Sequence, residues 1–444
     1  MPFDPVQKNP AQTRPDGAGL ASFSREALSL LRLAYPLIVG QLAVMGMAFT
    51  DAVVAGRLST ADLAGITLAG SIWSPLIILM ITLVVALNPF LAQHYGAGRL
   101  QEVGLEARQG LWVALGAGVF VSTLALALRG ALYRLDTDPG SIEVARGFLL
   151  WIAWGGPALG VSVALRAICE TAGFTHITMW VHGAALVLNA VLDVVFVFGK
   201  LGSPAMGGAG CGLASAIVYW FILLFVLTHL RMSRRYDGVR LFERPLRPSR
   251  RRISKLLRLG LPMSLGTTAQ IGFFSWLVMR IARDGSVAVA AHQVAMNFSN
   301  LVFMLPLGLS MGLTIRVAQR LGAEDGAGAR RIARSGIVLG GLTGTATAAL
   351  TLLFAPAIAA MYTRDGTVID LAVALLAIAA AFQVVDALQV VANAVLRACK
   401  DTFKPMLMVL AAYWGLGVAA VSVLGAGQIS PELSGVRGYW WGAV

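Results

Sequence analysis

The chain has 444 residues, of which 57% are hydrophobic and only 13% are charged. A soluble domain normally carries about 25% charged residues, so this composition excludes an ordinary water-soluble fold and indicates a protein surrounded mostly by lipid. The net charge of +13 comes mainly from short loops beside apolar segments, where basic residues orient a membrane protein, so we expect no nucleic-acid binding.

The first 24 residues are polar and contain Pro2, Pro5, Pro10 and Pro15. They lack the apolar run that a cleaved signal peptide requires. We therefore expect residues 1–24 to form a disordered cytoplasmic tail.

The segments that follow are apolar over the roughly 20 residues that a helix needs to cross a bilayer. The predicted spans are 29–55, 64–90, 106–128, 143–167, 176–199, 209–230, 256–282, 287–316, 334–362, 367–396 and 403–426. A twelfth segment begins near Gly435, and the sequence given ends at Val444. About eight residues cannot cross a hydrocarbon core of about 30 Å, so we expect the twelfth helix to be truncated. The predicted fold is all-α and integral to the membrane.

Residues 231–255 form a basic linker between the sixth and seventh spans, with only Asp237 and Glu243 as acidic residues. Positive charge in a short loop favours the cytoplasmic side. This orientation predicts a multi-pass protein of the cell inner membrane with a cytoplasmic N-terminus. The linker would separate an N-lobe over residues 25–230 from a C-lobe over residues 256–444.

The two lobes carry an internal repeat. A shift of 226 residues, which becomes 231 further along, aligns the second half with the first. The matched pairs include Pro36 with Pro262, Gln93 with Gln319, Gly96 with Gly322, and Arg166 with Arg397. Such self-similarity indicates a duplicated fold. Six spans per copy give both copies the same orientation, and two such bundles around a central cavity suit alternating access.

Few ionisable residues lie inside the predicted spans, and such residues are usually functional. They are Asp51 in the first span, Asp193 in the fifth and Asp386 in the tenth. Asn189 shares a helical face with Asp193 because the two are four residues apart. Together they offer oxygen ligands for a small cation, or a proton acceptor with a partner. The alternative is that Asp51 and Asp193 cap helix ends near the membrane surface.

Other chemistry has less support. Cys169, Cys211 and Cys399 give neither a disulfide framework nor a metal-ligand spacing, so we expect no resident metal and no cofactor. The spans contain no paired catalytic motif of the His-Glu-x-x-His or Gly-x-Ser-x-Gly type. We therefore expect no catalytic residues and no enzyme activity.

Several motifs together resemble those of the MATE family of multidrug and toxic compound extrusion transporters, nearest to its NorM-like branch. They are Pro36 followed by the Asp-Ala-Val-Val-Ala-Gly run at 51–56, Ala92-Gln93 with Gly96, the Asn189/Asp193 pair, and Asp386 leading to Leu396-Arg397-Ala398. The resemblance covers the chain from about Leu31 onward. It implies a two-lobe fold of twelve helices with a V-shaped opening, and cation-coupled export of organic cations.

The resemblance also implies site residues. Asp51, Asn189 and Asp193 match the acidic cluster of the N-lobe that this family uses for proton or sodium coupling. Ser215 stands where a threonine assists that cluster, and Asp386 matches the acid of the C-lobe.

One position departs from the NorM-like pattern. That branch has a glutamate ten residues after the Gly-Leu-Pro start of the seventh span, and this chain has Gln270 there. An amide oxygen can bind a cation, but the amide carries neither a charge nor a titrating proton. The departure removes a charged ligand from the C-lobe cation site and favours coupling through the N-lobe.

The predicted function is therefore an antiporter, coupled to H⁺ or Na⁺, that exports organic, often cationic compounds as a monomer in the bilayer. One alternative is a flippase for lipid-linked oligosaccharides from the same superfamily, which would need a cationic cavity for its pyrophosphate. The other alternative is a membrane enzyme.

Overall fold

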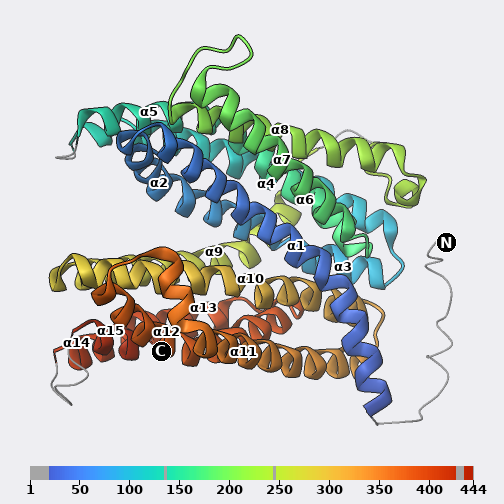
Figure 1. Ribbon diagram of the computed structural model, residues 1–444. Coiled ribbons are helices and arrows are strands. Elements are labelled where there is room, and N and C mark those ends of the chain that lie inside the picture. Colours follow the sequence, from blue (N-terminus) through green and yellow to red (C-terminus); the bar gives the residue numbers. More distant parts are fainter. Residues whose placement is uncertain (1–19, 135–137, 244–246, 427–434, 444) are drawn as a thin grey trace.

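The computed structural model describes residues 20–134, 138–243, 247–426 and 435–443, and most of these residues are helical, with no strand among them. The helices form two bundles (Figure 1), which confirms the predicted all-α membrane fold. The first bundle contains α1 (Leu20–Leu58), α2 (Thr60–Val85), α3 (Asn88–Gly96), α4 (Leu100–Leu128), α5 (Pro139–Ile152), α6 (Gly156–Thr171), α7 (His176–Phe198) and α8 (Ala209–Met232). The second contains α9 (Arg250–Ile281), α10 (Ser286–Gly322), α11 (Gly326–Tyr362), α12 (Gly366–Ala398), α13 (Phe403–Leu410), α14 (Val418–Gly425) and α15 (Val436–Ala443).

Three predicted spans are interrupted helices. The span at 64–90 runs from α2 into α3 across a turn at residues 86–87. The span at 143–167 consists of α5 and α6, joined by a 3₁₀ turn at Ala153–Gly155. Pro157 in the first turn of α6 accounts for this break, because proline lacks the N–H that would continue the helix and its ring clashes with the preceding turn. The span at 403–426 consists of α13 and α14, joined by a π-helical segment at Ala411–Gly417.

α9 is more polar than the other long helices. In the described part of the chain, ten segments are long and apolar enough to cross a membrane, and α9 is not one of them although it was predicted as the span 256–282. Ser264, Thr267 and Gln270 interrupt its apolar residues, and the Ser264 hydroxyl donates to the Leu79 carbonyl of α2. Polar groups at membrane depth normally face other helices or an aqueous cavity.

The first helix begins before its apolar run. α1 starts at Leu20, so residues 20–24, which were predicted as part of the tail, are helical. No proline occurs between Pro15 and Pro36, and a helix continues past the end of an apolar run when nothing interrupts its backbone hydrogen bonds. Residues 1–19 of the predicted tail lie outside the described part of the chain.

The two bundles meet at one end through a shared apolar core. Leu30 and Ala34 of α1 pack there with Leu309 and Leu313 of α10, and α12 adds Val391. Figure 1 shows the first half of α1 descending beside the second bundle while its second half lies in the first bundle. α1 therefore belongs to both bundles and ties them together at this end.

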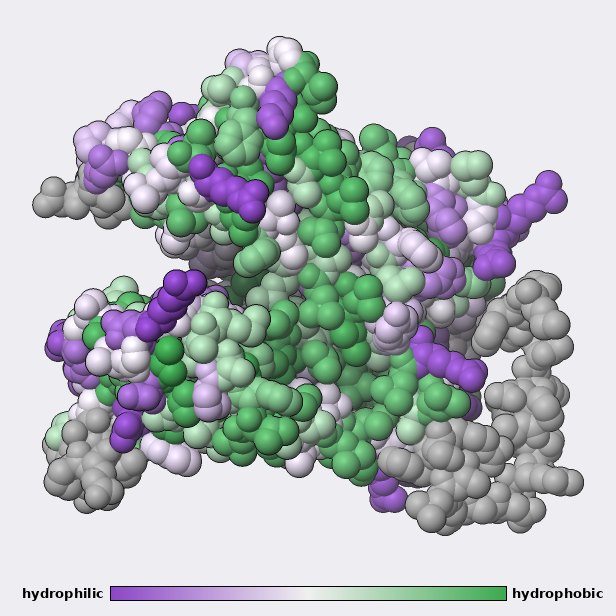
Figure 2. All heavy atoms as spheres, viewed as in Figure 1, coloured by the Kyte–Doolittle hydropathy of each residue, from purple (hydrophilic) through white to green (hydrophobic). Residues whose placement is uncertain are grey.

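The bundles separate at the opposite end. Figure 2 shows a deep notch between them on the side where α2 and α5 begin and α9 ends. The molecule thus has a V-shaped opening between its two bundles, and we call the joined side the closed end.

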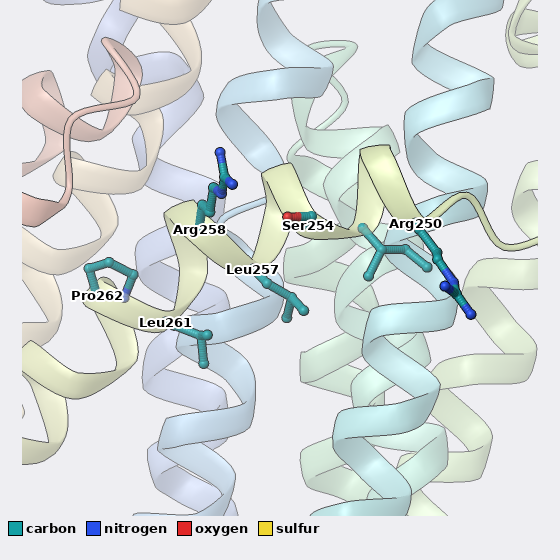
Figure 3. Close-up of a pocket in the computed structure, with 7 residues that line it drawn as sticks. Arg250, Ser254, Leu257, Arg258, Leu261 and Pro262 are labelled. Carbon is teal, nitrogen blue, oxygen red and sulfur yellow. The ribbon is translucent and has the colours of Figure 1, made fainter.

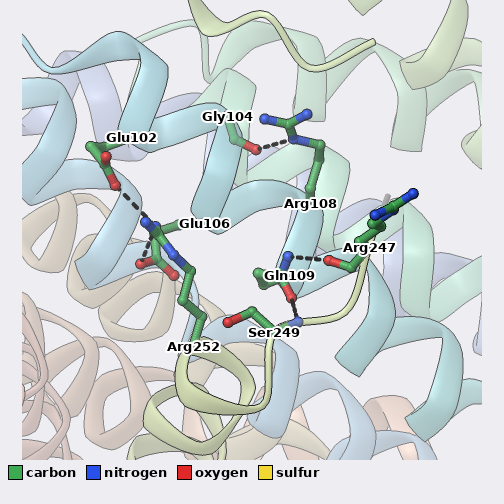
Figure 4. Close-up of polar contacts among 8 residues, drawn as sticks. All are labelled: Glu102, Gly104, Glu106, Arg108, Gln109, Arg247, Ser249 and Arg252. Carbon is green, nitrogen blue, oxygen red and sulfur yellow. Dashed lines mark hydrogen bonds and ion pairs between the residues drawn. The ribbon is translucent and has the colours of Figure 1, made fainter. Parts of the chain in front are cut away.

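The basic linker is anchored at the closed end. Figure 4 shows Arg252 at the start of α9 between two carboxylates of α4, with Nη1 at 2.9 Å from both Glu102 Oε2 and Glu106 Oε1. Gln109 of α4 accepts from the Ser249 N–H at 2.7 Å and donates to the Arg247 carbonyl at 2.9 Å. The linker is therefore fixed to the first bundle rather than free.

Candidate cation-coupling site

α1 and α7 run parallel and pack closely through glycines of α1. A Cβ on Gly40 would lie 3.1 Å from His182 Nδ1, and a Cβ on Gly46 would lie 3.2 Å from the Leu186 side chain. The two helices keep this alignment toward the open end. Asp51 of α1 therefore lies opposite the segment of α7 that carries Asn189 and Asp193. The small residues of α1 are thus the local reason that acids 142 positions apart in the sequence come together.

One amide joins the two acids. Asn189 Nδ2 donates to Asp51 Oδ1 at 3.2 Å and to Asp193 Oδ1 at 3.3 Å. The Ser215 hydroxyl of α8 donates to Asp51 Oδ2 at 3.5 Å. The structure therefore brings together all four residues predicted for the N-lobe site, which we call the Asp51 cluster.

The cluster is buried and keeps free oxygen atoms. Asn189 and Asp193 are 0% exposed, and Asn189 Oδ1 and Asp193 Oδ2 have no hydrogen-bond partner. Neither acid caps a helix, since α1 continues to Leu58 and α7 to Phe198. A buried oxygen atom without a hydrogen-bond partner destabilises the folded protein unless an ion, a proton or a water molecule binds it. This arrangement can hold a small cation through oxygen ligands, or a proton shared between the carboxylates.

Cys211 also belongs to this site, although its sequence spacing did not indicate a ligand. One ligand atom each from Asp51, Asp193 and Cys211 lies within 4.8 Å of the other two. Cys211 precedes Ser215 by four residues on α8, so both occupy the same helical face. That spacing was the available signal, but it indicates a ligand only once α8 is known to pack on α7 and to face Asp51.

The C-lobe candidates are separate from this cluster. Asp386 on α12 is 8% exposed, and its Oδ1 has no hydrogen-bond partner. Gln270 on α9 donates to the Tyr413 hydroxyl at 3.0 Å. Within the described residues, no hydrogen bond joins Asp386 to Gln270. Tyr413 was not predicted, because only the π-helical segment between α13 and α14 carries it to Gln270.

Aromatic side chains surround this amide–phenol pair. The Tyr413 ring lies 5.1 Å from Phe273 and 6.0 Å from Phe274, and Phe274 lies 6.1 Å from Phe382 of α12. Contacts of this kind stabilise packing and fix ring positions. The C-lobe candidates therefore adjoin a rigid aromatic group rather than a second set of acids.

A shallow groove of about 590 Å³ follows the first half of α9 (Figure 3). Leu257 and Leu261 give it apolar walls, and Arg250 and Arg258 also line it. All of its lining residues come from one helix, and none belongs to the Asp51 cluster or to the C-lobe candidates. The groove is thus separate from the predicted sites.

Sequence comparison identifies a family for the chain. The family model described as MatE matches residues 36–195 and again 262–421. The two matched ranges are offset by 226 residues, which is the shift that aligns the internal repeat.

Individual relatives agree with the family model. The chain is 35% identical over 422 residues to the multidrug resistance protein NorM of Aliivibrio fischeri, a match that covers 95% of this chain and 92% of that protein. It is 35% identical over 420 residues to the multidrug resistance protein MdtK of Yersinia pseudotuberculosis, covering 94% and 92%.

Comparison of structures gives the same fold. A transporter of the MOP superfamily from Pyrococcus furiosus superposes with a TM-score of 0.85 at 20% identity, covering 94% of this chain and 92% of that one. At this identity the likeness concerns the fold.

Proposed function

The chain belongs to the MatE family of transporters, and from this we propose that it is a cation-coupled antiporter that exports organic, often cationic compounds. It is a transporter and not an enzyme. Two of its relatives, NorM and MdtK, are named multidrug resistance proteins, which supports multidrug efflux. We further propose that the chain acts as a monomer in the inner membrane, with its N-terminus in the cytoplasm.

The observation that carries the coupling proposal is the shared amide of the Asp51 cluster. Two carboxylates from different helices meet at Asn189, and both Asn189 and Asp193 keep an oxygen without a partner. Binding of H⁺ or Na⁺ at the cluster would neutralise part of the negative charge that burial makes unfavourable. The same geometry suits either ion, since each needs only carboxylate and amide oxygens.

α1 connects the Asp51 cluster to the contact between the two lobes. Its second half carries Asp51, and its first half packs through Ala34 and Ile38 against α10. A cation drives a conformational change only by binding two states with different affinity. In this proposal, the position of α1 differs between the two states, so that cation binding at Asp51 favours one arrangement of the lobes.

The substrate occupies the cleft between the lobes. Asp386 supplies negative charge in the C-lobe, and Phe274 and Phe382, the half-buried rings of the aromatic group, supply flat apolar surface for a bulky organic cation. Gln270 holds the Tyr413 hydroxyl at 3.0 Å, so it positions the phenol rather than binding the coupling ion. With a cytoplasmic N-terminus, the open end in Figure 2 faces the outside.

Efflux from membrane vesicles tests this function. We expect ethidium transport to follow an imposed pH or Na⁺ gradient and Asp51→Asn to abolish gradient-driven transport, because the amide removes the negative charge but keeps the side-chain size. The gradient that drives wild-type transport identifies the ion. Asp370→Asn makes the same change at an exposed carboxylate of α12 and should transport normally. Wild-type transport by inserted Asp51→Asn protein would refute the coupling role.

A further inference from the structure

Cys211 changes the chemistry of the Asp51 cluster. Its thiol is buried, and its Sγ lies 3.9 Å from the Asp51 carbonyl oxygen and also interacts with the Asp193 carboxylate. Carboxylate and amide oxygens bind hard cations, whereas a thiolate selects soft ones such as Zn²⁺ or Cd²⁺. A transport site that uses only H⁺ or Na⁺ has no use for a sulfur ligand.

The ligand atoms are already close to a metal-binding arrangement. One atom each from Asp51, Asp193 and Cys211 lies within 4.8 Å of the others. A tetrahedral Zn²⁺ with bonds of about 2.0–2.3 Å holds its ligand atoms roughly 3.3–3.8 Å apart. Side-chain rotations that move the ligand atoms by about 1 Å would bring them from their present spacing to the zinc spacing without moving a helix.

Two further atoms point to a missing ligand. Asp193 Oδ2 and Asn189 Oδ1 belong to fully buried side chains, and neither has a hydrogen-bond partner. The Asn189 amide already contacts both carboxylates through its nitrogen, so a flip of the same amide would bring its oxygen to them. With this oxygen the site offers four donors, the number that tetrahedral zinc requires.

We propose that the Asp51 cluster together with Cys211 is a binding site for a thiophilic divalent cation, such as Zn²⁺ or Cd²⁺. The metal binds the Cys211 sulfur as thiolate, and the thiol proton passes to solvent. The thiolate and one carboxylate balance the two positive charges of the metal, and the other carboxyl group binds in its protonated form through its carbonyl oxygen. The bound metal occupies the coupling site and inhibits transport by competing with H⁺ or Na⁺. The inhibition rests on the proposed function, whereas metal binding does not.

Cd²⁺ titration of the purified full chain tests binding without any transport. We expect one saturable Cd²⁺ per chain, seen by equilibrium dialysis and by the ultraviolet charge-transfer band of a cadmium thiolate. Cys211→Ser should abolish the band, and Asp193→Asn should weaken binding by at least roughly 10-fold. Cys211→Ala serves as the second variant if the serine protein does not fold. Cys399→Ser removes an exposed cysteine and should leave the band unchanged.

Several results would overturn the proposal. The charge-transfer band could persist in both Cys211 variants, or it could be lost in Cys399→Ser. The wild-type chain could also show no saturable Cd²⁺ binding. Inhibition is then measured as Cd²⁺-dependent loss of efflux relative to each variant's own metal-free rate. If Cd²⁺ still inhibits efflux by the Cys211→Ser variant, the proposal that the bound metal competes with H⁺ or Na⁺ is overturned. A chain that binds Cd²⁺ but shows no efflux would instead count against the proposed function.

Discussion

Asn189 is the residue on which the geometry of the coupling site depends. Its side-chain nitrogen contacts both Asp51 and Asp193, which come from different helices. Without this donor, the buried Asp193 and the half-buried Asp51 carboxylates would face each other, and the Ser215 hydroxyl would remain as a partner for Asp51 only. Loss of one partner from a buried polar contact costs more than the contact itself contributes, because the remaining group stays desolvated.

Asn189→Leu should therefore destabilise the protein. The side chain keeps its approximate size and loses its donors, so we expect a loss of about 2 kcal/mol or more, visible as a lower melting temperature in detergent. Asn300→Leu makes the same change at an exposed position of α10 and should leave the melting temperature nearly unchanged. Equal melting temperatures for the two variants would show that Asn189 does not hold the acids.

At the scale of helices, close crossings of small residues set where the two lobes touch. A Cβ on Gly308 of α10 would lie 2.9 Å from the Ile38 backbone nitrogen of α1. The repeat-related crossing brings Gly260 of α9 against α2, where a Cβ would lie 2.8 Å from the Leu83 carbonyl oxygen. Backbone atoms cannot rotate away as side chains do, so neither crossing has room for a larger residue.

Gly308→Ala should lower stability even though alanine is the better helix former. In an open helical position this exchange gains about 1 kcal/mol, but here the methyl group meets α1 backbone. Gly70→Ala on α2 is the matched control, because a Cβ there has no atom within 4 Å. We expect opposite signs for the two changes in melting temperature. A rise for Gly308→Ala would contradict the proposed tight crossing.

At the scale of the whole molecule, related glutamines join the lobes at the closed end. Gln93 of α3 donates to the Ala398 carbonyl at 2.8 Å, and Gln319 of α10 donates to the Thr171 carbonyl at 2.7 Å. Both bonds run between the lobes, and the internal repeat relates the two glutamines that donate them. They exist only while this end is closed, so they stabilise the state shown in Figure 1 over a state that opens here.

Replacing both glutamines with leucine should populate the state that is open at this end. Two hydrogen bonds contribute about 2 kcal/mol together, which corresponds to a change of roughly 30-fold in the equilibrium. Spin labels at the exposed positions Gln101 and Ala327, in a Cys399→Ser background, report the distance between the lobes. We expect a longer-distance population in the double variant. Gln293→Leu, at an exposed glutamine of α10, should not produce it.

The sequence by itself determined the approximate positions of the apolar spans other than α9, the internal repeat and the acids inside the membrane. These follow from local physics: a bilayer requires helices of a minimum apolar length, and a charged group in such a helix stands out against its neighbours. The pairing of Asn189 with Asp193 was also predictable, because residues four apart share a helical face. The family resemblance, which rests on the same motifs, is confirmed.

Only the tertiary structure decided which of these residues meet. Asp51 joins Asn189 because glycines let α1 approach α7, and Cys211 joins them because α8 packs beside α7 and faces Asp51. Tyr413 reaches Gln270 across 143 positions, through a π-helical segment that no apolar pattern indicates. Helical periodicity determines the face on which a residue lies, but contacts between helices depend on packing among distant segments, and one sequence does not reveal that packing.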